Sequence, residues 1–164
     1  MPTIRDATEA DLPAILAITN QAIAETTAVW NNTPATLDAR AAWMADRQGR
    51  GFPVLVAVDG ADVLGFASFG DFRPFEGYVH TVEHSIYVAT TAQRRGVGAA
   101  LLAALVERAT AMGKHAVVGG IEAGNTASIA LHACAGFTEV GRLPEVGTKF
   151  GRWLDLVFMQ KLLG

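Results

Sequence analysis

A short stretch with two basic side chains and two glycines, Gln93-Arg94-Arg95-Gly96-Val97-Gly98-Ala99, has the composition of an anion-binding loop. It follows an alternating run, His84 to Val88, that predicts a strand, and it precedes residues 100–112, which predict a helix. The start of a helix offers unpaired backbone N–H groups and the positive end of the helix dipole. Glycine lets a ligand approach the backbone closely and tolerates positive φ. The stretch therefore predicts a cradle for a phosphate or pyrophosphate, the alternative being a solvated pair of arginines.

The composition limits the classes of protein that the sequence can describe. The 164 residues, 51% apolar and 18% charged, predict one folded domain over residues 1–164. The net charge of −3 argues against a general nucleic-acid binder, and no apolar run approaches the roughly 20 residues of a membrane span. The single Cys134 excludes an intrachain disulfide and a cysteine metal cluster, and the N-terminus has no signal-peptide layout. We therefore expect a soluble cytoplasmic protein with no metal, nucleic-acid or membrane partner.

The elements that must position the cradle follow from apolar spacing. Helical spacing predicts helices from about Glu9 to Ala24, from about Leu37 to Gln48, at 100–112, and from the cap Asn125 through about Ala135. Apolar runs bounded by turn residues predict strands at 3–5, 53–58, 63–70, 78–88, 116–121, 137–143 and 153–160. The resulting order, β-α-α-β-β-β-α-β-α-β-β, predicts an α/β or α+β fold with a mixed sheet flanked by helices.

Two motifs resemble the signatures of one enzyme family. The stretch from Gln93 to Ala99 resembles the coenzyme A loop, Gln/Arg-x-x-Gly-x-Gly/Ala, of the GCN5-related N-acetyltransferases. Further along, Asn125 to Phe137 resembles the second signature of that family, Asn-x-x-(Ala/Ser)-x-x-x-(Tyr/His)-x-x-x-Gly-Phe. The order of predicted elements also matches the family over nearly the whole chain. The resemblance implies the acyl-CoA N-acyltransferase fold, with a mostly antiparallel central sheet, and acetyl-CoA as the acetyl donor.

Three further segments resemble one branch of this family. Thr81 to Val88, together with Lys149 to Asp155, looks like the phosphinothricin acetyltransferases, and Arg73 to Gly77 is similar to their methionine sulfoximine/methionine sulfone branch. This resemblance implies acetyl transfer to the α-amine of a small amino-acid analogue, by direct attack in a ternary complex and commonly by a homodimer.

Coenzyme A needs partners for its pyrophosphate and for the amides of its pantetheine arm. Backbone N–H groups of the cradle are expected to bind the phosphates, and main-chain groups of the preceding strand are expected to bind the arm as an added strand would. The resemblance also implies cofactor contacts from Asn125 and Ser128, although Asn125 has the alternative of an ordinary helix cap and both roles can coexist. The expected cofactor-binding residues are Ile86, Tyr87, Val88, Arg94, Arg95, Gly96, Val97, Gly98, Ala99, Asn125 and Ser128.

An amine is protonated at neutral pH and needs a base before it can attack a thioester. Glu83 is the first candidate, because it precedes the cofactor segment and matches the glutamate assigned this role in the phosphinothricin enzymes; the alternative is a carboxylate on the solvent face. A carboxylate is a weak base, so burial or a water relay would have to assist it. His84, the second candidate, must point to the opposite face of the strand. A β-bulge near this position, known in the acetyltransferase sheet, could change that and would splay the strands.

The leaving thiolate of coenzyme A is helped by a proton donor. The resemblance places His132 where many family members have a tyrosine and where the phosphinothricin branch also has histidine. His132 is therefore a candidate general acid, and its alternative is a structural histidine. Cys134 in the same predicted helix has no cation placed by sequence to lower the pKa of its thiol, so we do not expect a nucleophile there.

A zwitterionic substrate needs a partner for its carboxylate and a pocket for its side chain. Arg73 is the predicted clamp, because a guanidinium binds a carboxylate bidentately; the alternative is a surface charge. Phe75 is expected to wall the side chain, with Thr27 and Trp30 closing the far side, unless Trp30 is core packing. Lys149 and Arg152 are expected to complete the site or a dimer contact. The expected substrate-binding residues are Arg73, Pro74, Phe75, Glu83, His84 and Ser85.

Two other functions remain open at this level. The same fold could bind acetyl-CoA as a sensor and acetylate nothing, or the enzyme could act on another amine, a polyamine or a protein N-terminus. A polyamine site should want more acidic residues than Glu76 and Glu83 provide.

Overall fold

The computed structural model describes residues 2–164 and has the predicted order of helices and strands. The strands are β1 (Thr3–Asp6), β2 (Val54–Asp59), β3 (Asp62–Asp71), β4 (Thr81–Val88), β5 (Ala116–Glu122), β6 (Thr138–Lys149) and β7 (Arg152–Leu162). The helices are α1 (Leu12–Glu25), α2 (Leu37–Gly49), α3 (Val97–Ala111) and α4 (Thr126–Cys134), with 3₁₀ turns at Glu9–Asp11, Glu76–Tyr78 and Thr90–Ala92. Within residues 2–164, no helix is both long and apolar enough to cross a membrane.

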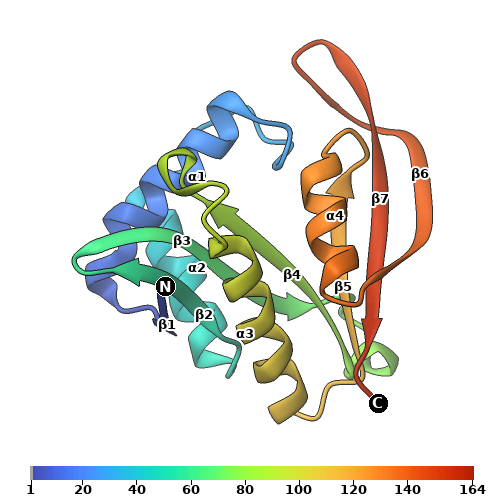
Figure 1. The fold of residues 1–164 in the computed structure, drawn as a ribbon, viewed down its shortest axis with the longest axis horizontal. Helices are drawn as coiled ribbons and strands as arrows, with labels where there is room; N and C mark the ends of the chain where they lie inside the picture. Colours follow the sequence, from blue (N-terminus) through green and yellow to red (C-terminus); the bar gives the residue numbers. More distant parts are fainter. Residues whose placement is uncertain (1) are drawn as a thin grey trace.

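All seven strands form one sheet in the order β1-β2-β3-β4-β5-β7-β6. The pairing of β4 with β5 is parallel, and every other pairing in this sheet is antiparallel. The predicted mixed, mostly antiparallel sheet flanked by helices is confirmed. In Figure 1, β4 and β5 run side by side near the lower edge and then diverge toward the top.

The helices cover both faces of this sheet. On one face α3 packs Leu101 and Leu105 against Phe69 of β3, and α4 lies beside α3 on the same face (Figure 1). On the other face Ile15 of α1 and Met44 of α2 pack against the strands β2 and β3. Because successive side chains of a strand point to opposite faces, each residue of β4 is assigned to one helix layer or the other.

The separation of β4 from β5 is the feature that positions the site. Their ladder runs from Thr81–Ala116 to His84–Gly119 and ends there, whereas both strands continue for several residues. The β-bulge that could have changed the directions of Glu83 and His84 is not found: the register of β4 with β3 is continuous from Val82 to Val88. The right-handed twist between neighbouring strands favours the separation of β4 and β5 once their short ladder ends.

Several predicted boundaries are also corrected. The strand predicted at 78–88 begins at Thr81, because residues 76–78 form a 3₁₀ turn. The helix predicted from residue 100 begins at Val97, so the end of the cradle forms its first turn. The first predicted helix is split, with a 3₁₀ turn at 9–11 before α1 and a proline at the start of α1. The strand predicted at 137–143 continues to Lys149 as β6, across a register shift that accommodates its proline and glycine.

Candidate active site

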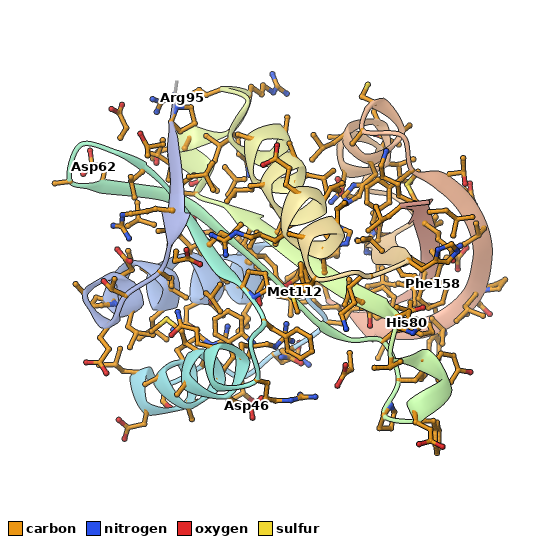
Figure 2. The ribbon with its side chains drawn as sticks, turned by 90° about the horizontal axis from the view of Figure 1, so that it is seen from below. Asp46, Asp62, His80, Arg95, Met112 and Phe158 are labelled. Carbon is orange, nitrogen blue, oxygen red and sulfur yellow. The ribbon has the colours of Figure 1, made fainter. Side chains whose placement is uncertain are left out.

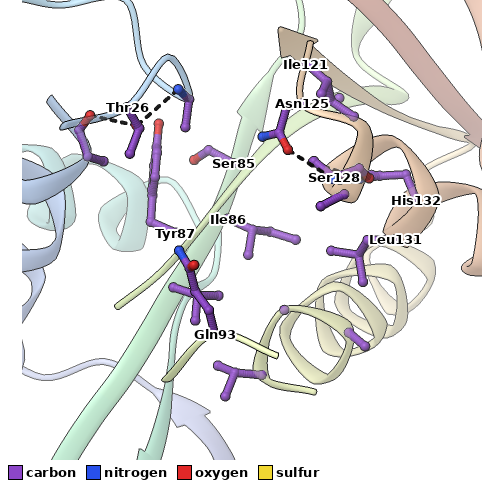
Figure 3. Close-up of a pocket in the computed structure, with 18 of the residues that line it drawn as sticks. Thr26, Ser85, Ile86, Tyr87, Gln93, Ile121, Asn125, Ser128, Leu131 and His132 are labelled. Atoms are coloured by element: carbon purple, nitrogen blue, oxygen red, sulfur yellow. Dashed lines mark hydrogen bonds between the residues drawn. The ribbon is translucent and has the colours of Figure 1, made fainter. Parts of the chain in front are cut away.

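A cavity of about 530 Å³ opens where β4 and β5 separate. Figure 3 shows its walls: β4 with Ser85, Ile86 and Tyr87 crosses the floor, and α4 with Asn125 and His132 forms one side. The start of α3 closes one end, and α1 with the loop after it forms the opposite side. The cavity is therefore long and reaches from a helix N-terminus to the centre of the sheet.

The cradle predicted from sequence lies at the α3 end of this cavity. Gly96 has φ of +78°, a conformation that favours glycine, and it turns the chain into α3. No side chain within residues 2–164 caps this helix, so the N–H groups of its first turn remain available to an anion. Arg94 and the residues 96–99 all line the cavity. The free N–H groups and the positive dipole end at the start of α3 therefore suit a phosphate.

Arg95 differs from its neighbour. Its guanidinium lies 3.6 Å from the Asp59 carboxylate at the end of β2, beside a smaller separate pocket. Figure 2 places Arg95 on the same side of the molecule as Asp62 of the β2–β3 turn, away from Phe158. Of the two arginines predicted to bind the cofactor, the structure brings only Arg94 to the cavity.

The edge of β4 that faces β5 is free beyond His84. Ile86, Tyr87 and Val88 line the cavity, and in the described part of the chain β5 makes no ladder with them. Their backbone groups on this edge can therefore pair with an extended ligand as a further strand would. The Tyr87 side chain instead points to the α1/α2 face and packs on Phe66, with ring centroids 5.2 Å apart.

Asn125 and Ser128 also line the cavity from α4. The Asn125 side chain accepts a hydrogen bond of 3.1 Å from the Ser128 N–H, which makes it the cap of this helix. The predicted cap is confirmed, and the same residue is placed where it can contact a ligand.

His84 and His132 meet across the cavity from β4 and α4. Their Nε2 atoms lie 2.8 Å apart, and the two side chains are 8% and 4% exposed. His84 Nδ1 lies 3.0 Å from the carbonyl oxygen of Val118, and His132 Nδ1 lies 2.7 Å from that of Ser128. Burial lowers the pKa of both imidazoles, and in His84, where His132 adds repulsion, the pKa is about 4.

Glu83 lies on the other face of β4, as strand alternation requires, and does not line the cavity. It pairs across the ladder with Gly70 of β3. Burial raises the pKa of the Glu83 carboxyl, and the charges of Arg73 and Arg47 partly oppose this rise. The structure thus provides the burial that a glutamate base needs, on the α1/α2 side of the sheet.

The segment predicted to bind the substrate carboxylate lies outside the cavity. Arg73 is exposed, donates to the Phe72 carbonyl oxygen and stacks on the Phe72 ring at 4.4 Å. Pro74 is exposed, and Phe75 is 69% exposed. Of the predicted substrate residues, His84 and Ser85 line the cavity.

The loop after α1 is bound to the β6–β7 hairpin. Lys149 is 2% exposed and donates to the carbonyl oxygens of Thr26 and Val29, at 2.6 and 2.7 Å. The ring of Trp30 lies against Gly147, where a Cβ atom would come within 2.1 Å of it. Lys149 is therefore an internal tether, and its burial excludes the predicted dimer contact.

Thr27 and Arg152 complete the predicted set. Thr27 is half-buried, and its hydroxyl lies 3.5 Å from the Glu122 carboxylate, which belongs to the cavity lining. Arg152 is exposed at the start of β7. Thr27 therefore lies next to a residue of the cavity wall but does not itself line the cavity.

Arg47 of α2 was missed by sequence reasoning. It donates to the Ser68 hydroxyl at 3.2 Å, and its guanidinium lies 2.8 Å from where a Cβ of Gly70 would stand. Gly70 is the cross-strand partner of Glu83, so Arg47 lies over the same part of the sheet. The signal was available: Arg40 and Arg47 share the helical stripe of Trp43 and Met44, at i, i+3, i+4 and i+7.

A metal centre has no ligand set in the described chain. Residues 2–164 bring no three histidine, cysteine, aspartate or glutamate side chains together in a way that could hold an ion.

Comparison with known proteins assigns the class. The Acetyltransferase (GNAT) family matches residues 15–137. An L-methionine sulfoximine/L-methionine sulfone acetyltransferase of Pseudomonas aeruginosa is 57% identical over 96% of this chain and 92% of its own length. The crystal structure of a ribosomal-protein-alanine N-acetyltransferase from Brucella melitensis is 56% identical, with a TM-score of 0.97 over 98% of this chain and 99% of that one.

A third relative was solved with a ligand. The phosphinothricin acetyltransferase of Sinorhizobium meliloti, in complex with AcCoA, is 38% identical with a TM-score of 0.97, over 99% of this chain and 89% of that one. The chain belongs to the GNAT acetyltransferase family, as the two motifs predict.

Proposed function

We propose that this protein is an acetyl-CoA-dependent N-acetyltransferase for the α-amine of a small amino-acid analogue of the methionine sulfone, methionine sulfoximine or phosphinothricin type. The observation that carries the proposal is the cavity between β4 and β5, which joins a free helix N-terminus to a free strand edge. The names of the 57% and 38% identical relatives support the substrate class. Residues 1–164 form the N-acetyltransferase domain in this proposal.

Acetyl-CoA supplies the acetyl thioester, and the chain provides the groups that hold it. Arg94 and the N–H groups of residues 96–99 take the phosphates, because the helix end and the guanidinium are both positive there. Main-chain groups of Ile86 to Val88 take the pantetheine amides, since this strand edge lacks a protein partner. Asn125 and Ser128 bound the opposite wall.

Glu83 is the proposed base that removes a proton from the substrate ammonium. Its burial raises the pKa of the carboxyl toward that of a useful base, while the charges of Arg73 and Arg47 partly oppose this rise. Because Glu83 lies on the α1/α2 face, the amine approaches the thioester from that side. Arg73 and Phe75 lie on an exposed segment near this face and are proposed to bind the carboxylate and the side chain of the substrate.

His132 is the proposed acid that protonates the leaving thiolate. It projects from α4 into the cavity on the opposite face of β4 from Glu83. The base and the acid therefore stand on the two sides of the strand edge that holds the thioester, which lets the amine enter and the thiolate leave without crossing.

A protein N-terminus is the second candidate substrate. It is favoured by one observation, the name of the 56% identical Brucella melitensis relative, which specifies an alanine of a ribosomal protein.

The test is thiol release from acetyl-CoA, followed with a chromogenic disulfide, in the presence of single acceptors. We expect turnover with methionine sulfone, methionine sulfoximine or phosphinothricin, and much less with an alanine-terminated peptide or spermidine. Turnover confined to the peptide would transfer the assignment to protein N-termini. Tight acetyl-CoA binding with no turnover on any amine would make the protein a binding module.

We also propose a homodimer and a cytoplasmic location. The β6–β7 hairpin carries large exposed apolar side chains, including Leu143, Val146 and Trp153, the last 70% exposed, and such a patch suits a second copy of the chain. Sedimentation analysis should give twice the 17.3 kDa chain mass, and a monomer at all concentrations would contradict this. One cysteine, exposed and unpaired, supports a reducing compartment.

A further inference from the structure

The contacts of the His84–His132 pair decide where its protons are. Both Nδ1 atoms face backbone carbonyl oxygens, at 3.0 Å in His84 and 2.7 Å in His132. A carbonyl oxygen can only accept a hydrogen bond, so each Nδ1 must carry a hydrogen. A neutral imidazole has one N–H, and on each ring this N–H is the Nδ1–H that donates to the carbonyl oxygen.

The remaining nitrogens then confront each other. In two neutral rings of this tautomer, both Nε2 atoms present lone pairs, and these lone pairs face each other across 2.8 Å. No hydrogen bond joins the two Nε2 atoms in that arrangement. Both rings are buried, and a buried nitrogen without a hydrogen-bond partner lowers stability. One added proton removes the conflict, because it forms an N–H⁺···N bond at a normal distance for such a bond. A second proton would place two cations at 2.8 Å.

We propose that His84 and His132 together hold one proton, shared between their Nε2 atoms, and that His84 is the positioning residue that keeps His132 protonated for acid catalysis. The carbonyl oxygens of Val118 and Ser128 fix both tautomers. The ring of Phe137 packs on both imidazoles, with centroids 5.6 and 5.3 Å away. The backbone of β5 fits this arrangement closely: a Cβ on Gly119 would stand 2.6 Å from Cε1 of His84.

Few charged groups lie where they could donate a proton to the two imidazoles or take one from them. From β4, Glu83 and Tyr87 point to the other face; from β5, Glu122 lines the far part of the cavity and approaches Thr27. From the cradle, Arg94 lies at the α3 end, and from β7, Lys161 donates to the Ala135 carbonyl oxygen behind α4. None of them is hydrogen-bonded to either imidazole among the described residues. Burial lowers the pKa of each imidazole for a proton of its own, and the shared Nε2–H⁺···Nε2 bond is the contact that opposes this lowering for a single proton.

The catalytic part of this inference rests on the proposed function. Glu83 removes one proton from the substrate ammonium and passes it to solvent. The neutral amine then forms a C–N bond to the thioester carbonyl carbon and gives up a second proton to Glu83. The C–S bond then breaks, its electron pair stays on sulfur, and the thiolate takes the shared proton from His132. The pair is left neutral with two opposed lone pairs, an unfavourable state that promotes its reprotonation by the proton released from Glu83 through solvent. Charge and protons balance over the cycle.

The proton inventory is tested on the free protein, without substrate. Nitrogen-15 NMR of histidine-labelled protein resolves four residues, and His80→Gln and His115→Gln assign the two exposed ones. We expect both Nδ1 atoms of the buried pair to be protonated near neutral pH, with the two Nε2 signals sharing one further proton. A bare Nδ1 on either ring, or two bare Nε2 atoms, would overturn the proposal whether or not the protein acetylates anything.

The positioning role is tested by kinetics. His84→Phe keeps the ring volume and removes the partner nitrogen, and we expect kcat to fall about ten- to a hundredfold. The basic limb of the kcat profile should move to lower pH, because burial alone lowers the pKa of His132. His84→Gln, which retains an acceptor, should restore part of both effects, and Gly119→Ala, which displaces the His84 ring, should imitate His84→Phe.

Acetyl-CoA affinity, measured by calorimetry, separates this role from a folding defect and should change less than threefold in His84→Phe. If NMR of the free protein finds the shared proton but the kcat profile of His84→Phe does not move, His84 has no role in the reaction. The proposed acetyltransferase activity would stand in that case. Absent turnover in the unaltered protein would instead refute the proposed function alone.

Discussion

The two faces of β4 offer opposite environments to neighbouring residues. His84 points under α4, where it is 8% exposed and its imidazole meets the partner ring, a carbonyl oxygen and an aromatic side chain. Glu83, one residue earlier, points toward α2, where its carboxyl is half-buried beneath arginines. Burial raises the pKa of the glutamate and lowers that of the histidine. The raised pKa makes the Glu83 carboxylate a better base, whereas the lowered pKa of His84 leaves its own ring neutral and able to accept the proton of His132.

The difference follows from strand alternation. Adjacent residues of a strand cannot share a face, so the base Glu83 and His84, the residue that positions the acid, are kept apart by the strand itself. The ladder with β5 ends at His84, so the thioester can lie along the exposed edge between the two groups. Changes on the two faces should therefore have separable effects.

The largest effect is expected from Glu83→Gln. Removing the base should lower kcat about 10²- to 10⁴-fold, the usual contribution of a general base. The dissociation constant of acetyl-CoA should hardly change, because Glu83 does not line the cavity. Steady-state kinetics and calorimetry measure the two quantities. Glu76→Gln, on the exposed 3₁₀ turn, is the matched control. Unchanged turnover in Glu83→Gln would remove Glu83 as the base.

The loop that walls the α1 side of the cavity depends on Lys149. Lys149→Met retains most of the stem but leaves two carbonyl oxygens, of Thr26 and Val29, without their donor. A hydrogen bond from a charged group contributes about 1.5–3 kcal/mol, so we expect about 3 kcal/mol lower unfolding free energy. Urea denaturation measures this loss. Arg152→Met, exposed at the start of β7, should have little effect. Equal stability of the two variants would refute the tether.

The fold was predictable because its evidence is local. Apolar alternation and helical spacing identify each element from its own residues, and the order of elements is confirmed. Errors occurred where local signals mislead. Tyr78 and Val79 extend the strand pattern, yet a 3₁₀ turn precedes β4. The glycines before residue 100 conceal the first turn of α3.

The parts of the site that could be predicted are those formed by one continuous segment of the chain. The cradle and the Asn125 cap are each made by a few consecutive residues. Lys149 could not be placed, because its acceptors are backbone carbonyls of a loop far away in the sequence, and backbone carbonyls leave no sequence signal. The meeting of His84 with His132 likewise depends on where the β4–β5 ladder ends.

Arg47, on the α1/α2 side of the sheet, should affect the pH dependence of turnover through Glu83. Its positive charge lowers the pKa of the Glu83 carboxyl, so its removal should raise that pKa further. The base form would then appear at higher pH, and the acid limb of kcat/KM should move upward. In Arg47→Met we expect kcat/KM to fall about tenfold on this limb and less at alkaline pH. Arg50→Met, whose exposed partner is Asp71, is the control. A limb that moves to lower pH would contradict the assignment.

The smallest effect is expected at the cradle, where two adjacent arginines have different surroundings. Arg94 lines the cavity, whereas Arg95 pairs with Asp59 at 3.6 Å. Arg94→Ala should weaken acetyl-CoA binding about five- to tenfold, since an exposed charge at a phosphate contributes about 1 kcal/mol, and added salt should reduce the difference. Arg95→Ala should change affinity less than twofold. Calorimetry at two salt concentrations checks both, and equal losses would mean that Arg95 leaves Asp59 to bind the ligand.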